Sequence, residues 1–187
     1  MKQSFAPLLL VWSCALAPPA RAYSEADLIA VARQSVAAAV RGQSAPAPQN
    51  GEAARPVFVT IERRGQVCGC RGNLRARAAS LQEEVALAAR SAARADPRYR
   101  PLVPADLNDF LVTVTVVEKQ RPLEIGALGS LQRDEGLVLQ SGNKIGVVLP
   151  WEGSDPRVRL GWAYKKAGVA PGSSCRLYRL IAARFRG

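Results

Sequence analysis

The chain has 187 residues, with 26 lysines and arginines against 15 aspartates and glutamates, and it contains no histidine. Without histidine, catalytic dyads and triads that use an imidazole base are excluded, so chemistry here must use thiols, carboxylates, cations or backbone dipoles. The net charge of +11 permits acidic partners, but the basic residues are scattered through every segment, which is typical of a solvated surface.

Residues 1–22 have the pattern of an export signal. Lys2 supplies a positive charge, an apolar stretch follows from Phe5 to Ala17, and Ala20-Arg21-Ala22 fits a small-x-small cleavage site. The apolar stretch is shorter than the ~20 residues that span a bilayer, and no other stretch is apolar enough. We therefore expect a signal peptide at residues 1–22 and an exported chain, periplasmic or secreted, without a transmembrane segment afterwards.

The remaining residues, 23–187, have the size of one domain. They number 165 and carry a net charge of +9, and a chain of that length buries enough surface for a single core. Nucleic acid is not the expected partner, because an exported protein rarely meets it. The expected partner is an unidentified small ligand or protein, and the sequence identifies no cofactor.

The first half of this domain predicts two helices and a hairpin. Ser24 begins a helix whose apolar residues recur at a spacing of four as far as Gly42. Val57 to Ile61 alternates as a strand, and Arg63-Arg64-Gly65 turns it back into a cysteine-containing strand. Ser80 with Glu83 then forms a capping box for a second helix, which Asp96-Pro97 ends.

The second half predicts a central strand, a second hairpin, a short helix and a final strand. The central strand is Leu111 to Val117, rich in valine and threonine. The hairpin joins residues 137–139 to residues 145–149 across Ser141-Gly142-Asn143. The helix covers Val158 to Ala167, and the last strand covers Leu177 to Phe185. Hairpins mixed with helices, without regular alternation of strand and helix, predict an α+β domain with an antiparallel or mixed sheet flanked by helices.

The segment from Gly65 to Leu74, Gly-Gln-Val-Cys-Gly-Cys-Arg-Gly-Asn-Leu, is the most informative part of the chain. In a regular strand, residues two apart face the same side at about 6.6 Å, so Cys68 and Cys70 are expected to project together. The glycines at 69 and 72 permit close approach of a ligand to the backbone, and exposed N–H groups there suit an anion.

The order of motifs resembles the AMMECR domain family. The family shows Leu-Arg-Gly-Cys-Ile-Gly after a strand, then Asp-Pro-Arg-Phe, a Leu-Pro turn and Lys-Ala-Gly-Leu. The corresponding segments here are residues 67–72, Asp96-Pro97-Arg98-Tyr99, Val148-Leu149-Pro150 and Lys166-Ala167-Gly168-Val169. The family's first arginine is replaced by Cys68 and its isoleucine by Arg71, and the turn after Pro150 lacks the usual Gln-Val.

The resemblance implies a two-lobed α+β fold with a site around the Gly-Cys motif and no settled biochemical activity. It brings Arg98 near this motif, whose cysteine here is Cys70, the candidate nucleophile if the protein is an enzyme. The full set of candidate ligand-binding residues is Gly69, Arg71, Gly72, Asn73, Arg98 and Lys166. Because the family pattern lacks Cys68, this residue is the preferred disulfide partner of Cys175, although Cys70 remains an alternative.

Four functions are open for the thiol segment. The first is ligand or partner binding at Gly-Cys-Arg-Gly, with structural cysteines. The second is redox cycling of Cys68 and Cys70, with Arg71 lowering a thiol pKa. The third is covalent catalysis by Cys70, for which Lys144 or Glu118 would have to replace the missing histidine base. The fourth is soft-metal binding by the two thiols together with Cys175, which suits Cu(I) or zinc. Binding is the preferred interpretation, and enzymatic activity is left open.

Overall fold

The computed structural model describes residues 23–44 and 52–187, so the predicted signal peptide lies outside the described residues. Within these ranges six strands form one antiparallel sheet in the order β2-β1-β3-β6-β4-β5. The strands are β1 (Val57–Arg63), β2 (Gln66–Gly72), β3 (Phe110–Leu123), β4 (Gly136–Ser141), β5 (Lys144–Val148) and β6 (Arg176–Arg186). The helices are α1 (Glu25–Arg41), α2 (Leu81–Arg94) and α3 (Pro156–Ala167), with short 3-10 turns at Pro104–Asn108 and Ile125–Ser130.

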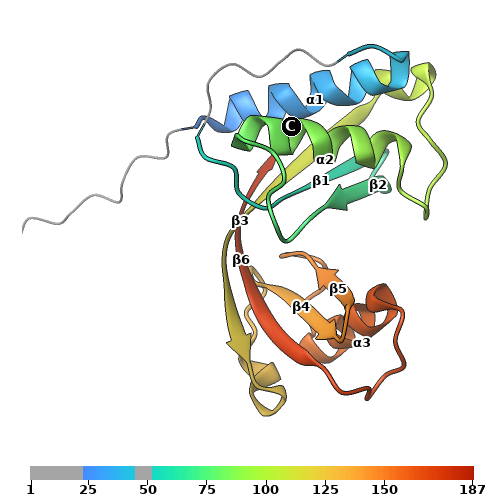
Figure 1. Cartoon of the computed structure of the whole chain (residues 1–187). Coiled ribbons are helices and arrows are strands. Elements are labelled where there is room, and N and C mark those ends of the chain that lie inside the picture. The colour runs from blue at the N-terminus through green and yellow to red at the C-terminus, as the bar shows by residue number, and fades with distance from the viewer. Residues whose placement is uncertain (1–22, 45–51) are drawn as a thin grey trace, which may run out of the picture.

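The sheet is curled and carries two lobes (Figure 1). One lobe holds α1 and α2 against β1, β2 and the adjoining parts of β3 and β6. The other lobe holds β4, β5 and α3, while the long strands β3 and β6 run through both. The α+β prediction is confirmed. None of the helices that the structure describes has the length and apolar character needed to cross a membrane.

The helix boundaries follow from the predicted caps. The Ser24 side chain accepts a hydrogen bond from the Asp27 amide, and Gly42 ends α1 in the left-handed conformation with φ of 70°. At α2 both halves of the Ser80–Glu83 capping box are present. These caps satisfy amide groups that have no partner inside the helix.

Both predicted hairpins are present. Arg64 and Gly65 turn β1 into β2 with φ of 49° and 76°, as expected for the mirror-image turns that match strand twist. β4 and β5 are joined across Gly142 and Asn143, with Ser141 opposite Lys144. β3 extends beyond the predicted Leu111–Val117, because its second half pairs with β6 in the other lobe.

A β-bulge contradicts the expectation that Cys68 and Cys70 project together. Ile61 lies opposite Gly69, while the next residue, Glu62, lies opposite Val67, so Cys68 is the extra residue of β2. The extra residue changes the alternation of side chains at that point. Cys68 therefore packs against the core beneath α1 and α2, whereas Cys70 packs against a separate cluster on the opposite face.

Candidate functional site

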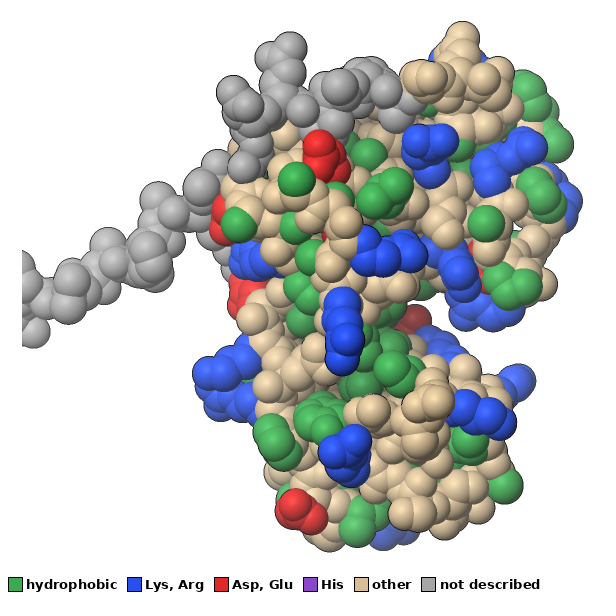
Figure 2. Space-filling view, viewed as in Figure 1, with side chains coloured by type: hydrophobic (Ala, Val, Ile, Leu, Met, Phe, Trp, Pro, Cys, Tyr) green, Lys and Arg blue, Asp and Glu red, His purple; other side chains and the backbone are tan. Residues whose placement is uncertain are grey.

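A cleft of about 750 Å³ lies between the two lobes. Figure 2 shows the recess, with lysine and arginine side chains along its rim. Both edge strands of the sheet contribute to it, because the curl brings β2 and β5 to the same opening. The lining residues are Phe58, Cys70, Arg71, Gly72, Pro97, Arg98, Ile145, Val147, Leu149, Glu152, Trp162, Lys165 and Lys166.

Asp96 and Arg98 hold the Cys70 end of the cleft in place. The buried Asp96 carboxylate accepts hydrogen bonds from the Cys70 amide at 2.8 Å and from Nε and Nη2 of Arg98 at 3.0 and 2.8 Å. Nη2 of Arg98 also donates to the Cys70 carbonyl at 2.9 Å. Such a two-point arginine–carboxylate pair fixes the guanidinium plane. The Asp96-Pro97-Arg98 motif is therefore a clamp on β2 that also orients a cation at the cleft.

The Cys70 thiol is held in its neutral form. Burial raises the pKa of the thiol, although a hydrogen bond from the Thr60 hydroxyl at 3.2 Å and the charges of Lys166 and Arg98 act in the opposite direction. The nearby Glu152 raises the pKa further. Arg71, which was expected to lower a thiol pKa, is exposed, and its Nε donates to Ser91 on α2 at 3.4 Å.

Positive charge dominates the rim of the cleft. Arg71 and Arg98 come from the side of β2, and Lys165 and Lys166 come from the last turn of α3. The one carboxylate in the lining, Glu152, forms an ion pair with Lys166 and also accepts from the Leu149 amide. The lining thus has four cations and one anion around an apolar floor.

The structure gathers five of the predicted site residues in this cleft: Cys70, Arg71, Gly72, Arg98 and Lys166. Gly69 is elsewhere: a Cβ added to it would lie 2.2 Å from the Ala92 carbonyl oxygen, so this glycine permits close packing of α2 on β2 instead of ligand approach. Asn73 is also outside the lining, and its amide extends the ladder by donating to Val57. Gly72 is the glycine of the motif that faces the cleft.

Glu152 and Lys165 line the cleft but are not among the residues predicted from the sequence. Glu152 follows the Leu149-Pro150 turn at which the chain departs from the family pattern, and that departure is the signal that marks it. Lys165 precedes the Lys166-Ala167-Gly168 motif and is placed beside the cleft by the last turn of α3. Lys144, a proposed substitute base, donates to the Gly168 carbonyl and does not line the cleft.

Cys68 lies in a different and smaller cavity of about 300 Å³. Arg63, Arg64 and Arg100 share its lining with Gln66, Tyr99 and Leu102. Burial raises the pKa of the Cys68 thiol, and the charges of Arg63 and Arg100 oppose this rise. Cys68 and Cys70 consequently open to different spaces, which removes the geometry that the dithiol redox hypothesis needs.

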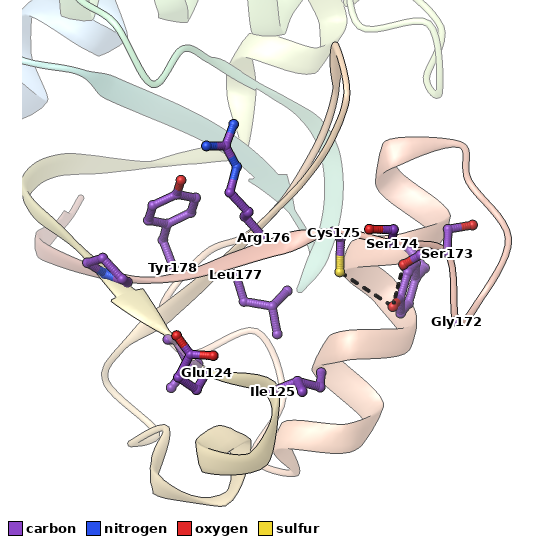
Figure 3. Close-up of a pocket in the computed structure, with 12 residues that line it drawn as sticks. Glu124, Ile125, Gly172, Ser173, Ser174, Cys175, Arg176, Leu177 and Tyr178 are labelled. Carbon is purple, nitrogen blue, oxygen red and sulfur yellow. Dashed lines mark hydrogen bonds between the residues drawn. The ribbon is translucent and has the colours of Figure 1, made fainter.

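Cys175 lies in a third cavity of about 580 Å³ where β3 ends and β6 begins (Figure 3). Its Sγ is 3.5 Å from the Tyr164 hydroxyl, which also donates to the Ser173 carbonyl. Hydrogen bonding to Cys175, together with burial, raises the pKa of Tyr164.

The three described cysteines are free, so the expected Cys68–Cys175 disulfide is not formed. Cys68 packs beside the α1–α2 core and Cys175 beside the α3 core, in different lobes. For the same reason the described residues contain no cluster of three metal-ligating side chains. The soft-metal hypothesis required three thiols at one place, and the fold separates them.

Comparisons with known proteins agree with the fold. The AMMECR1 family model matches residues 29–187. A protein of Aeropyrum pernix is 35% identical over 180 residues, covering 85% of this chain and 77% of the relative. A protein of Methanothermobacter thermautotrophicus is 35% identical over 145 residues, covering 70% and 74%. The crystal structure of the uncharacterized protein PH0010 from Pyrococcus horikoshii has the same fold, with a TM-score of 0.76 and 23% identity over 85% of this chain and 89% of that one.

Proposed function

We propose that this chain, which belongs to the AMMECR1 family, is a binding protein whose interlobe cleft binds an anionic ligand with an apolar part. The observation that supports this proposal is the composition of the cleft lining. Four cations surround apolar residues that include Phe58, Leu149 and Trp162, and Lys166 neutralises Glu152, the one carboxylate in the lining. Ligand pockets combine an apolar surface with a few placed polar groups in this way.

Arg98 is the best placed of the four cations. Its clamp to Asp96 uses Nε and Nη2, and no hydrogen bond among the described residues uses Nη1. Its side chain is 48% exposed, so a ligand oxygen can reach it. A guanidinium that is fixed in advance loses little rotamer freedom when it binds a carboxylate or phosphate.

We assign Cys70 to the lining of the cleft and not to catalysis. A thiol nucleophile acts as its thiolate, and burial works against that form here. The hydrogen-bond partner of Sγ is the Thr60 hydroxyl, which donates to the sulfur and is not a base. Binding therefore has more support than covalent catalysis by Cys70, which stands as the alternative.

The test uses two fluorescent probes of similar shape, anionic 8-anilinonaphthalene-1-sulfonate and neutral N-phenyl-1-naphthylamine. We expect the anionic probe to bind more tightly, with an affinity that falls as salt is added. Lys165→Gln should weaken its binding about 2- to 5-fold, the size expected for one rim charge. Lys119→Gln is the matched control, because Lys119 is exposed on β3 and does not line the cleft. Equal binding of both probes, unaffected by Lys165→Gln, would refute the proposal.

We also propose that the chain is exported, with cleavage after Ala22. The support is the sequence of residues 1–22, in which a basic residue, an apolar run and a small-x-small site follow one another. Expression of the full chain in a bacterium, followed by fractionation and N-terminal sequencing, tests this. A chain that starts at Tyr23 in the periplasm or medium supports export, and an intact N-terminus in the cytoplasm contradicts it.

A further inference from the structure

The cleft is the place where the sheet fails to close. Its two walls are the edge strands β2 and β5, and both belong to the same antiparallel sheet. Along the outer edge of an antiparallel sheet every second residue turns its N–H and C=O groups away from the neighbouring strand. Such groups pair readily with another extended chain unless something covers them.

The edge of β2 is covered at Cys70. Cys70 is a residue whose N–H and C=O turn outward, and the Asp96 carboxylate and Arg98 guanidinium bind these two groups at 2.8 and 2.9 Å. The two side chains thus occupy the hydrogen-bonding positions that a neighbouring strand would use. Strand addition to β2 is therefore blocked at Cys70.

The edge of β5 is uncovered. Because Gly142 and Asn143 form a two-residue turn, the Ser141–Lys144 pair closes the hairpin and the backbone of Gly146 faces β4. The N–H and C=O groups of Ile145 and Val147 therefore point away from the sheet. Among residues 23–44 and 52–187, no hydrogen bond engages these four groups.

The surroundings of this edge select a particular kind of chain. The side chains of Ile145 and Val147 line the cleft, and that of Ile145 is 48% exposed. An extended segment along β5 would run past the cations Lys165, Lys166 and Arg98. Apolar contacts on one side and positive charge at the rim complement a segment that carries apolar residues and carboxylates.

We infer that the ligand of the cleft is an extended acidic peptide segment of a partner protein, which adds to β5 as a further strand. This inference rests on the proposed anionic-ligand function and names its substrate class. Backbone hydrogen bonds to Ile145 and Val147 hold the peptide, and the cations read its carboxylates. In strand addition of this kind the main chain supplies affinity and the side chains supply specificity.

The first experiment uses a fluorescein-labelled peptide, Thr-Val-Thr-Val-Glu-Glu with a free carboxyl terminus, and fluorescence anisotropy with the full domain. Two further peptides carry N-methyl groups on alternate backbone amides, one set in each register. Only every second amide of an added strand donates a hydrogen bond to β5. We therefore expect the peptide that is methylated at those amides to lose at least tenfold in affinity, and the other methylated peptide to bind within threefold of the parent. A peptide with Lys-Lys in place of Glu-Glu should bind at least tenfold more weakly.

Amide-resolved hydrogen exchange gives a second readout without altering the protein. The parent peptide should slow exchange at Ile145 and Val147, while Gly146, which already faces β4, should change little. Val147→Pro removes an outward N–H without removing a ladder hydrogen bond, as edge strands tolerate, and should abolish peptide binding. Val147→Thr keeps the N–H and is its control. If Val147→Pro does not fold, the two N-methylated peptides still test strand addition at β5.

The outcomes separate the two proposals. Equal binding of both N-methylated peptides, or unchanged exchange at Ile145 and Val147, overturns strand addition. Binding of the anionic naphthalene probe without binding of the peptide also overturns it and leaves the anionic-ligand function standing. If neither the probe nor the peptide binds, the proposed function itself fails and the inference fails with it.

Discussion

Asp96 is the residue on which the geometry of the cleft depends most. It is buried, it fixes Arg98, and it satisfies an edge amide of β2 that would otherwise have no protein partner. Burial disfavours the charged carboxylate and is the largest influence on its pKa, but hydrogen bonds from Arg98 and from the amides of Cys70 and Arg98 together hold the pKa below its usual value. The carboxylate is thus charged in the folded state.

Asp96→Asn should destabilise the protein by roughly 1.5 to 3 kcal/mol at neutral pH, since hydrogen bonds to a charged group are lost and Arg98 is released. The folded pKa of Asp96 is lower than the unfolded value, so its stabilisation is complete above about pH 4 and is lost as the pH falls further. The difference between wild type and variant should therefore shrink in acid. Urea unfolding at pH 7, 5 and 3 measures this.

Asp134 is exposed and forms no hydrogen bond or ion pair with the residues that the structure describes, so it provides the matched control for this prediction. Asp134→Asn should change the free energy of unfolding by less than about 0.5 kcal/mol at each pH. If Asp96→Asn behaves in the same way as Asp134→Asn, the clamp does not contribute to stability.

At the scale of elements, the features that depend on neighbouring residues were predictable. The caps at Ser24 and Ser80 and the turns at Arg64-Gly65 and Gly142-Asn143 involve contacts within a few residues, and each lies where its local pattern indicated. By contrast, the expected nearness of Arg98 to the Gly-Cys segment came from the family resemblance, and in the structure Arg98 donates to the Cys70 carbonyl.

Features that depend on distant segments were not predictable. The bulge at Cys68 arises from a shift in the pairing register between β1 and β2, and the sequence pattern of β2 does not indicate it. The role of Gly69 depends on α2, which follows more than ten residues later. Lys165 joins the cleft only because α3 folds against β5. Composition and periodicity describe single elements and do not state how the sheet curls.

Gly146 shows how closely α3 packs on the edge strand that we propose as the docking site. A Cβ at this position would lie 1.9 Å from the Ala163 carbonyl oxygen and 2.9 Å from the Ala167 amide nitrogen. These are backbone atoms of α3 that cannot move without the helix. α3 carries three residues of the lining, so its position relative to β5 sets the width of the cleft.

Gly146→Ala should therefore destabilise the protein by about 1 to 3 kcal/mol, the usual range for overpacking, and should weaken binding of the naphthalene probe because α3 is displaced. Gly161→Ala is the contrasting variant, since a Cβ there meets nothing within 4 Å. In a helix interior it should stabilise by up to about 1 kcal/mol. Urea unfolding of both variants tests the pair, and a neutral Gly146→Ala would contradict the close packing.

At the scale of the whole molecule, the two lobes share one sheet. β3 and β6 pair along ten positions, from Leu123–Leu177 in one lobe to Thr113–Arg186 in the other. A third apolar cluster joins the lobe cores at the concave face and contains Phe58, Val117, Val138, Leu149 and Leu180. With the strands and this cluster in common, neither lobe retains a complete core when the other unfolds.

The molecule should therefore unfold in one cooperative transition, and the cysteines provide a reporter for each lobe. Cys68 is packed beside the core under α1 and α2, and Cys175 beside the core under α3. Pulse alkylation with iodoacetamide along a urea gradient, followed by peptide mass spectrometry, should give the same midpoint for both thiols. Leu180→Ala, in the joining cluster, should lower both midpoints together by an amount equivalent to about 2 to 5 kcal/mol. Two separate midpoints would show that each lobe folds on its own, and the cleft would then be an interface between independent units instead of a gap in one sheet.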